Sequence, residues 1–158
     1  MAALTAATAR RYRIVQSWTQ NFRVANADVL YVGSWSGLPG ANGNTSRRGY
    51  LTTYRDTVGF IWAGLTLPGG TPGDLSTTNS ITGSTSASPV VEASVECGSF
   101  IFERPAVTGV SAQTDVARTS VYASNDNDLT VTAAQSPAVG RVIYWYTSTT
   151  CDVLFYGM

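Results

Sequence analysis

Residues 125–145 read NDNDLTVTAAQSPAVGRVIYW, and this stretch decides the expected fold. It opens on NDND, whose residues tolerate the left-handed backbone conformation of a tight turn. Apolar and polar residues then alternate from Asp128 to Ala133, which is the pattern of a half-buried strand. AAQSPAVG breaks the pattern, and an apolar strand-like run follows. The stretch predicts two strands joined by turns, and nothing in it resembles a reactive site.

Other parts of the chain repeat this pattern of short strands and turns. VVEASVEC (90–97) alternates, and VGFIWAGL (58–65) is apolar on both faces, so we expect it to be central. A charged fraction of 13%, together with many β-branched residues and turn formers, also favours strands. A chain of 158 residues is long enough for one domain with a real core. We predict an all-β fold with a small barrel or sandwich as its body. Further strands are expected at 28–33, 50–56, 99–103, 119–124, 141–147 and 152–157.

Two segments differ from this body, which we place at residues 28–158. Residues 1–27 carry large apolar side chains without clean periodicity, so we predict an extended N-terminal arm that packs on the body or on a partner. Residues 67–89 are rich in Ser, Thr, Gly and Pro and are predicted to be an exposed loop outside the core. Gly98, between two strand-like segments, is expected to mark a bulge or a tight bend.

Charge is unevenly distributed along a chain whose formal net charge is zero. Residues 1–55 hold seven arginines and one acid (+6), whereas residues 56–158 hold three arginines and nine acids (−6). The N-terminal part is therefore expected to meet something negative. The alternative is an arm that folds back on its own acidic body. Nucleic acid is a weaker candidate, because no basic and aromatic recognition motif is present. The candidate partner-binding residues are Arg10, Arg11, Arg13, Trp18, Phe22, Arg23, Arg47 and Arg48.

Little in the sequence suggests catalysis. Histidine and lysine are both absent, and no nucleophile or phosphate-loop motif occurs. Glu92 and Glu96 are about 13 Å apart along one strand, too far for a glycosidase pair, and are expected on a solvated face. The turn 126–128 lacks the glycine and the closing glutamate of a calcium loop. We predict no catalytic, cofactor-binding or metal-binding residue.

Cys97 and Cys151 fit no metal pattern. They are either two buried hydrophobic side chains or, outside a reducing cell, a disulfide. The N-terminus does not have the pattern of a secretory signal, and no run approaches the ~18 apolar residues of a membrane helix. A soluble protein made in a cytosol is expected.

Residues 119–157 resemble the C-terminal half of the capsid decoration (cement) proteins of tailed phages, of the β-tulip kind. Residues 28–66 resemble the first half of such proteins, whereas the loop 67–89 and the Arg-rich arm depart from the pattern. The matching elements of the C-terminal half are Val121-Tyr122, the turn 125–128, the strand 129–132, Ala138-Val139-Gly140, Val142-Ile143 and Val153-Leu154-Phe155.

The resemblance implies a homotrimer on the outer surface of an icosahedral phage head, made in the host cytoplasm and carried in the virion. The partners would be the major capsid protein and other copies of this chain, with no nucleic acid, membrane or cofactor involved. An alternative is a carbohydrate- or receptor-binding module of a phage fibre or cell surface, using Trp35 and the 67–89 loop. A weaker alternative is a non-catalytic domain of a secreted enzyme. The candidate core or trimer residues are Trp62, Tyr144, Trp145 and Phe155.

Overall fold

The computed structural model describes residues 11–39, 49–55, 59–67, 80–83, 91–133, 135 and 137–156. The predicted all-β fold is confirmed, since the only helix among these residues is the short 3-10 turn η2 (Gln113–Asp115). None of the described residues forms a helix that is long and apolar enough to cross a membrane. The strands are β1 (Tyr12–Arg23), β2 (Val29–Tyr31), β3 (Trp35–Leu38), β4 (Thr52–Thr53), β5 (Ile61–Thr66), β6 (Ser80–Thr82), β7 (Glu92–Phe102), β8 (Val107–Thr108), β9 (Ser120–Ala123), β10 (Leu129–Thr130), β11 (Gly140–Thr147) and β12 (Thr150–Tyr156).

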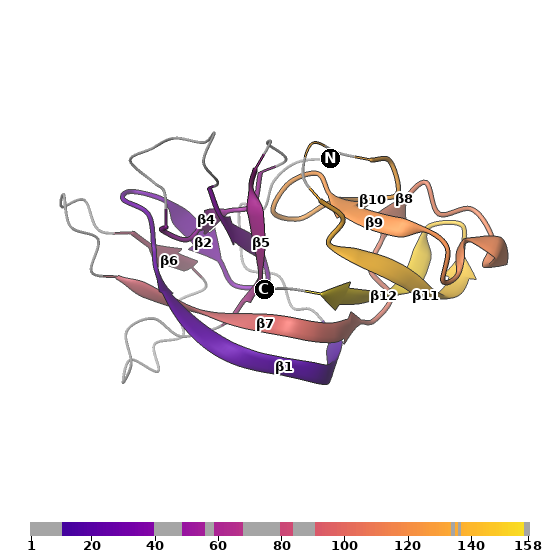
Figure 1. The fold of residues 1–158 in the computed structure, drawn as a ribbon, viewed down its shortest axis with the longest axis horizontal. Coiled ribbons are helices and arrows are strands. Elements are labelled where there is room, and N and C mark those ends of the chain that lie inside the picture. Colours follow the sequence, from indigo (N-terminus) through magenta and orange to yellow (C-terminus); the bar gives the residue numbers. More distant parts are fainter. Residues whose placement is uncertain are drawn as a thin grey trace.

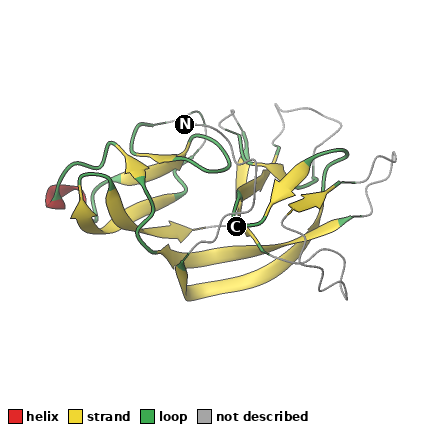
Figure 2. Cartoon of the chain, turned by 180° about the vertical axis from the view of Figure 1, so that it is seen from behind, coloured by secondary structure: helices red, strands yellow, loops and turns green. Residues whose placement is uncertain are grey.

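One curled sheet contains most of these strands, in the order β4-β3-β5-β7-β12-β11-β9-β10-β8. Strand β1 pairs with β7 outside this path, and β2 and β6 form a separate pair. The sheet curls far enough for Arg55, after β4, to form an isolated bridge with Asn125, after β9. In Figure 1, β1 and β7 run together as a long ribbon along the bottom of the view, from below β6 to near β12. Figure 2 shows the same ribbon from behind.

Strand β7 contributes to two hydrophobic clusters, which lie on opposite sides of it. Ala93, Val95 and Cys97 belong to a second, smaller cluster, whereas Phe100 and Phe102 belong to the main cluster. Because alternate residues of a strand face opposite sides, the buried side changes from odd to even positions along β7. The irregularity expected at Gly98 is present at this change: its φ is +81°, and the pairing register of β1 shifts beside it.

The change of buried side corrects the prediction for Glu96. This residue was expected on a solvated face, but it is only 5% exposed. It lies where both sides of β7 are covered, and its carboxylate accepts a hydrogen bond from the Ser17 hydroxyl on β1. Glu92, nearer the start of the strand, is half-buried.

Part of the predicted loop 67–89 belongs to the fold, which corrects the prediction that it contributes nothing to the core. Residues 80–82 form β6, which pairs antiparallel with β2. Ile81 points into the second cluster and is buried, because it is the one large apolar residue of that short strand. Residues 68–79 and 84–89 lie outside the described residues.

Several predicted strands are confirmed, but those expected at 28–33, 50–56, 119–124 and 128–133 are shorter than predicted. Strand β5 is central, between β3 and β7, and all but its first residue are buried. Strands β11 and β12 form the closing hairpin. At the turn 125–128, the Asn125 side-chain oxygen accepts hydrogen bonds from the backbone N–H groups of Asn127 and Asp128, both at 2.8 Å. The strand expected over 128–133 spans only Leu129–Thr130, which pairs with β9 on one side and with β8 on the other.

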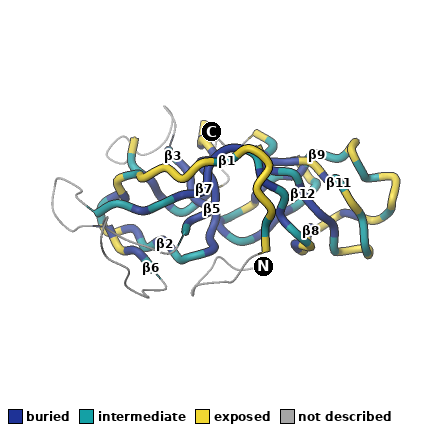
Figure 3. The backbone as a smooth tube through the Cα atoms, turned by 90° about the horizontal axis from the view of Figure 1, so that it is seen from below, coloured by how far each residue is buried: buried dark blue, intermediate teal, exposed yellow. Residues whose placement is uncertain are grey.

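Residues 12–23, which the sequence places in the N-terminal arm, form strand β1. It pairs with β7 from Tyr12↔Phe102 to Arg23↔Glu92. An extra residue at Val15 forms a bulge, so even-numbered residues point to one side of β1 before it and to the other side after it. This inversion explains why the apolar residues of this segment show no clean periodicity in the sequence. Figure 3 shows β1 exposed along most of its length, and residues 1–10 lie outside the described part of the chain.

Both cysteines are buried and free, so of the two alternatives the disulfide is wrong. Burial, with a smaller contribution from the charge of Glu96, raises the pKa of the Cys97 thiol to about 11. Burial, followed by the charges of Asp152 and Asp115, raises the pKa of the Cys151 thiol to about 12. Each thiol therefore keeps its proton at neutral pH and behaves as a small hydrophobic side chain.

We expect neither thiol to react with a disulfide reagent at pH 8 in the folded protein, and both to react in urea. Because the folded pKa values exceed the usual 9.0, the unfolded chain loses these protons first. The stability that the protonated thiols contribute is present below pH 9 and is lost as the pH rises towards 11 and 12. Thiol titration with and without urea tests the burial, and rapid labelling of the folded protein at pH 8 would contradict it.

Candidate functional site

Strands β11, β12, β7 and β1 form a four-strand sheet whose two faces differ in what they contact. Residues paired across neighbouring strands share a face, so the register sorts the side chains into rows. The row that faces the main hydrophobic cluster is Val142, Val153, Phe102 and Tyr12. The next row faces the opposite way and consists of Arg141, Leu154, Ile101 and Arg13.

The outward side of this sheet carries exposed aromatic and arginine side chains. In the row just described, the two arginines are exposed and the two aliphatic residues are half-buried. Tyr144, paired with Asp152, continues this side in one direction and is 54% exposed. Trp18, paired with Cys97, continues it in the other direction; it is 49% exposed, and its ring lies against Gly98. We call this surface the outer face and define it as Arg13, Trp18, Ile101, Arg141, Tyr144 and Leu154.

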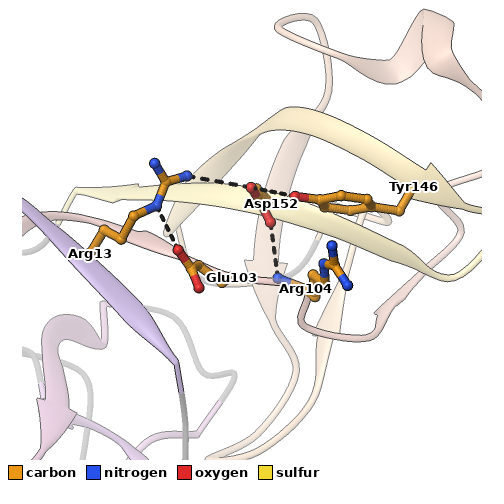
Figure 4. Close-up of polar contacts among 5 residues, drawn as sticks. All are labelled: Arg13, Glu103, Arg104, Tyr146 and Asp152. Carbon is orange, nitrogen blue, oxygen red and sulfur yellow. Dashed lines mark hydrogen bonds and ion pairs between the residues drawn. The ribbon is translucent and has the colours of Figure 1, made fainter.

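A polar cluster holds one end of the outer face together (Figure 4). The Asp152 carboxylate, 4% exposed, accepts hydrogen bonds from the Arg104 backbone N–H at 3.0 Å and from the Tyr146 hydroxyl at 3.1 Å. The Arg13 guanidinium lies 2.6 Å from a Glu103 oxygen and 3.6 Å from an Asp152 oxygen. The Arg104 guanidinium lies 4.4 Å above the Tyr146 ring. These contacts connect β1, β7, β11 and β12 and fix the position of Arg13.

The expectation that the arm folds back on an acidic body therefore holds at Arg13. The other charges are arranged differently. All seven described arginines are exposed, whereas none of the eight described acids is: five are buried and three are intermediate. Within the described part of the chain, the guanidinium groups therefore lie at the surface, whereas five of the eight carboxylates are buried.

A shallow apolar recess lies where β5 and β12 approach each other. Ile61 and Tyr156 at its rim are 48% and 41% exposed. Such side chains exposed together on strands are typical of a contact surface. The recess is lined by Tyr54, Phe60, Ile61, Trp62, Pro137, Ala138 and Tyr156.

Comparison with known proteins finds no relative. No family model matches the sequence, no curated protein matches it, and no solved structure matches the fold. Within the described residues, no group of three or more Cys, Asp or Glu side chains is placed to hold a metal ion. What the outer face itself offers is apolar contact and guanidinium donors on a rigid sheet.

The four residues predicted to be in the core or in the trimer contact lie in different places. Trp62 and Phe155 are buried in the main cluster and stack with ring centroids 5.3 Å apart. Trp145 is partly buried against the same cluster, and Tyr144 is on the outer face. Trp35, the aromatic residue named for the carbohydrate alternative, is fully buried with its ring 5.1 Å from that of Phe155. That interpretation of Trp35 is wrong, because its ring fills the core and is inaccessible to a sugar.

The predicted partner-binding residues are also divided. Arg13 and Trp18 are on the outer face, whereas Phe22 packs against the second cluster. Arg11 and Arg23 are exposed near the ends of β1. Arg10, Arg47 and Arg48 lie outside the described residues.

Sequence reasoning missed Ile101, Leu154 and Arg141 as surface residues. Each belongs to a segment that reads as an apolar strand. Alternation shows which residues of one strand share a side, but not which residues of different strands do. The register between strands is what brings them together.

Proposed function

We propose that this chain is a structural protein of a tailed-phage head. It is a decoration protein that binds the outer surface of the icosahedral shell, bridges neighbouring major capsid subunits and stabilises the shell. The proposal starts from the resemblance of residues 119–157 to such proteins. The observation that carries it is the outer face, which combines half-exposed Trp18 and Tyr144 with exposed arginines.

The composition of this face is typical of a protein–protein interface. Aromatic residues and arginine are the side chains most enriched among those that dominate binding energy at interfaces. Strand pairing holds Trp18 on β1 against β7, and the Tyr144 ring lies 4.7 Å from that of Tyr146. Side chains that are already positioned lose less conformational entropy on binding, so more of the contact energy appears as affinity.

In this proposal three copies assemble through a second surface. The apolar recess with Ile61 and Tyr156 contains none of the four residues of the row that joins Arg13 to Arg141, and it supports a subunit contact beside the shell contact. A trimer places three outer faces on the shell at once. Their contacts then combine through effective concentration, so that modest patches hold strongly. A protein that binds only the assembled lattice stabilises that lattice by linkage.

A double variant of the outer face, Trp18→Ser with Tyr144→Ser, tests the proposal. We expect its affinity for heads assembled from the major capsid protein of the same phage to fall at least about tenfold, because each ring is a candidate hot spot. Co-sedimentation with heads measures occupancy, and the melting temperature reports folding.

Tyr31→Ser, on the separate β2–β6 pair, is the matched control and should leave occupancy unchanged. Wild-type occupancy by a well-folded double variant would exclude the outer face from shell binding.

A further inference from the structure

We infer that the outer face recognises an acidic protein surface, in which carboxylates lie on both sides of an apolar strip. The inference rests on the proposed function and specifies the chemistry of the shell surface that this face contacts. It is carried by the row that joins Arg13 to Arg141.

The row sets the spacing of the groups that a partner must match. Its four residues lie on four adjacent strands. With strands about 4.8 Å apart, the backbones at Arg13 and Arg141 are separated by about 14 Å. Ile101 and Leu154 lie between them and are half-buried. A complementary surface therefore has an apolar strip about two side chains wide, with a hydrogen-bond acceptor at each edge.

Arginine favours a carboxylate at those edges. Its planar guanidinium donates two parallel hydrogen bonds to a carboxylate, which adds geometric specificity to the charge attraction. Arg141 forms no ion pair with any carboxylate that the structure describes. Arg13 already contacts Glu103 through its Nε atom and lies 3.6 Å from Asp152 through its Nη2 atom, so less of its guanidinium is left for a partner. Arg141 is therefore the more informative residue to change.

A second copy of this chain does not fit the same face. An isologous contact places identical patches against each other, so the two arginine rows would meet. Like charges brought together at an interface repel each other and oppose the contact. Of the eight described acids of this chain, five are buried and three are only partly exposed, so they offer a neighbouring copy few accessible carboxylates. The occupant is therefore a different chain, which in the proposed function is the major capsid protein.

Charge reversal at Arg141, compared with the same reversal at Arg55, tests the inference. Both arginines are exposed, and both changes alter the net charge by two units. Arg55 lies at the bridge to Asn125, away from the row of the outer face. We expect Arg141→Glu to weaken binding to heads of the same phage at least tenfold at 0.1 M salt, and Arg55→Glu to change it less than twofold. The melting temperature confirms that both variants fold.

Salt provides a second measurement on the same samples. The screening length falls from about 10 Å at 0.1 M to about 3 Å at 1 M, so wild-type binding should weaken and the difference between the two variants should shrink. If the wild type binds heads and Arg141→Glu binds equally well, the inference is overturned while the proposed function stands. Equal weakening by both variants also overturns it, since net charge alone would then explain the effect. Failure of the wild type to bind heads overturns the proposed function and this inference together.

Discussion

Replacing Phe155 by alanine is expected to lower the free energy of unfolding by about 3–5 kcal/mol. The Phe155 side chain is fully buried, and its ring stacks on those of Trp62 and Phe100, with centroids 5.3 and 5.4 Å away. The Trp35 ring centroid is also 5.1 Å from that of Phe155, so the truncation opens a cavity at the centre of the main cluster. Surrounding rings of this size cannot collapse fully into the space, and their lost contacts add to the lost transfer free energy. Urea unfolding measures the change.

Tyr144→Ala provides the comparison for Phe155→Ala. The Tyr144 ring is 54% exposed on the outer face, so its removal should alter the free energy of unfolding by no more than about 0.5 kcal/mol. If the two variants were equally destabilised, or if Phe155→Ala cost less than about 1 kcal/mol, the main cluster would not be centred on Phe155.

Gly64→Ala is expected to destabilise the protein by about 3 kcal/mol, at the upper end of the usual cost of overpacking. Gly64 lies in β5 next to Leu65, which pairs with Glu96 of β7. A methyl group at position 64 would overlap the carbonyl oxygen of Glu96 and press on the Val95 side chain. The obstacle is backbone, so relief requires β5 and β7 to separate. Thermal or urea unfolding measures the loss.

Gly49→Ala separates this steric effect from backbone strain. Both glycines have positive φ, but no atom lies within 4 Å of a methyl group added at Gly49. The strain alone should cost about 1 kcal/mol at position 49. Similar losses for the two variants would show that β5 does not approach β7 as closely as described.

The sequence was most informative where the pattern of buried residues does not change along a strand. Strand β5 is apolar on both faces and proved central, and the strands expected at 141–147 and 152–157 are present as the paired strands β11 and β12. Alternation failed where the buried side changes. In β1 the bulge at Val15 inverts the pattern, and in β7 the change beside Gly98 buries Glu96. Neither event has a local signal beyond a single glycine, because each depends on which neighbouring strands cover which side.

The candidate site was predictable only in part, for the same reason. Arg13 and Trp18 could be suspected from a basic, apolar N-terminal segment. Their association with Arg141 and Leu154 requires the register of four strands that are distant in sequence. The sequence also did not predict that the described arginines are exposed while most of the described carboxylates are buried. Equal numbers of arginines and acids do not show which of them lie inside the fold.

The temperature at which heads release their DNA tests the proposed function most directly. Heads that carry the protein and heads stripped of it can be heated in parallel with a dye that fluoresces on free DNA. Because a protein that binds only the intact lattice stabilises it in proportion to occupancy, decorated heads should release DNA at a higher temperature. Re-adding the wild-type protein should restore that temperature, and the Trp18→Ser/Tyr144→Ser variant should not. Identical release temperatures for decorated and stripped heads would contradict the stabilising function proposed for this protein.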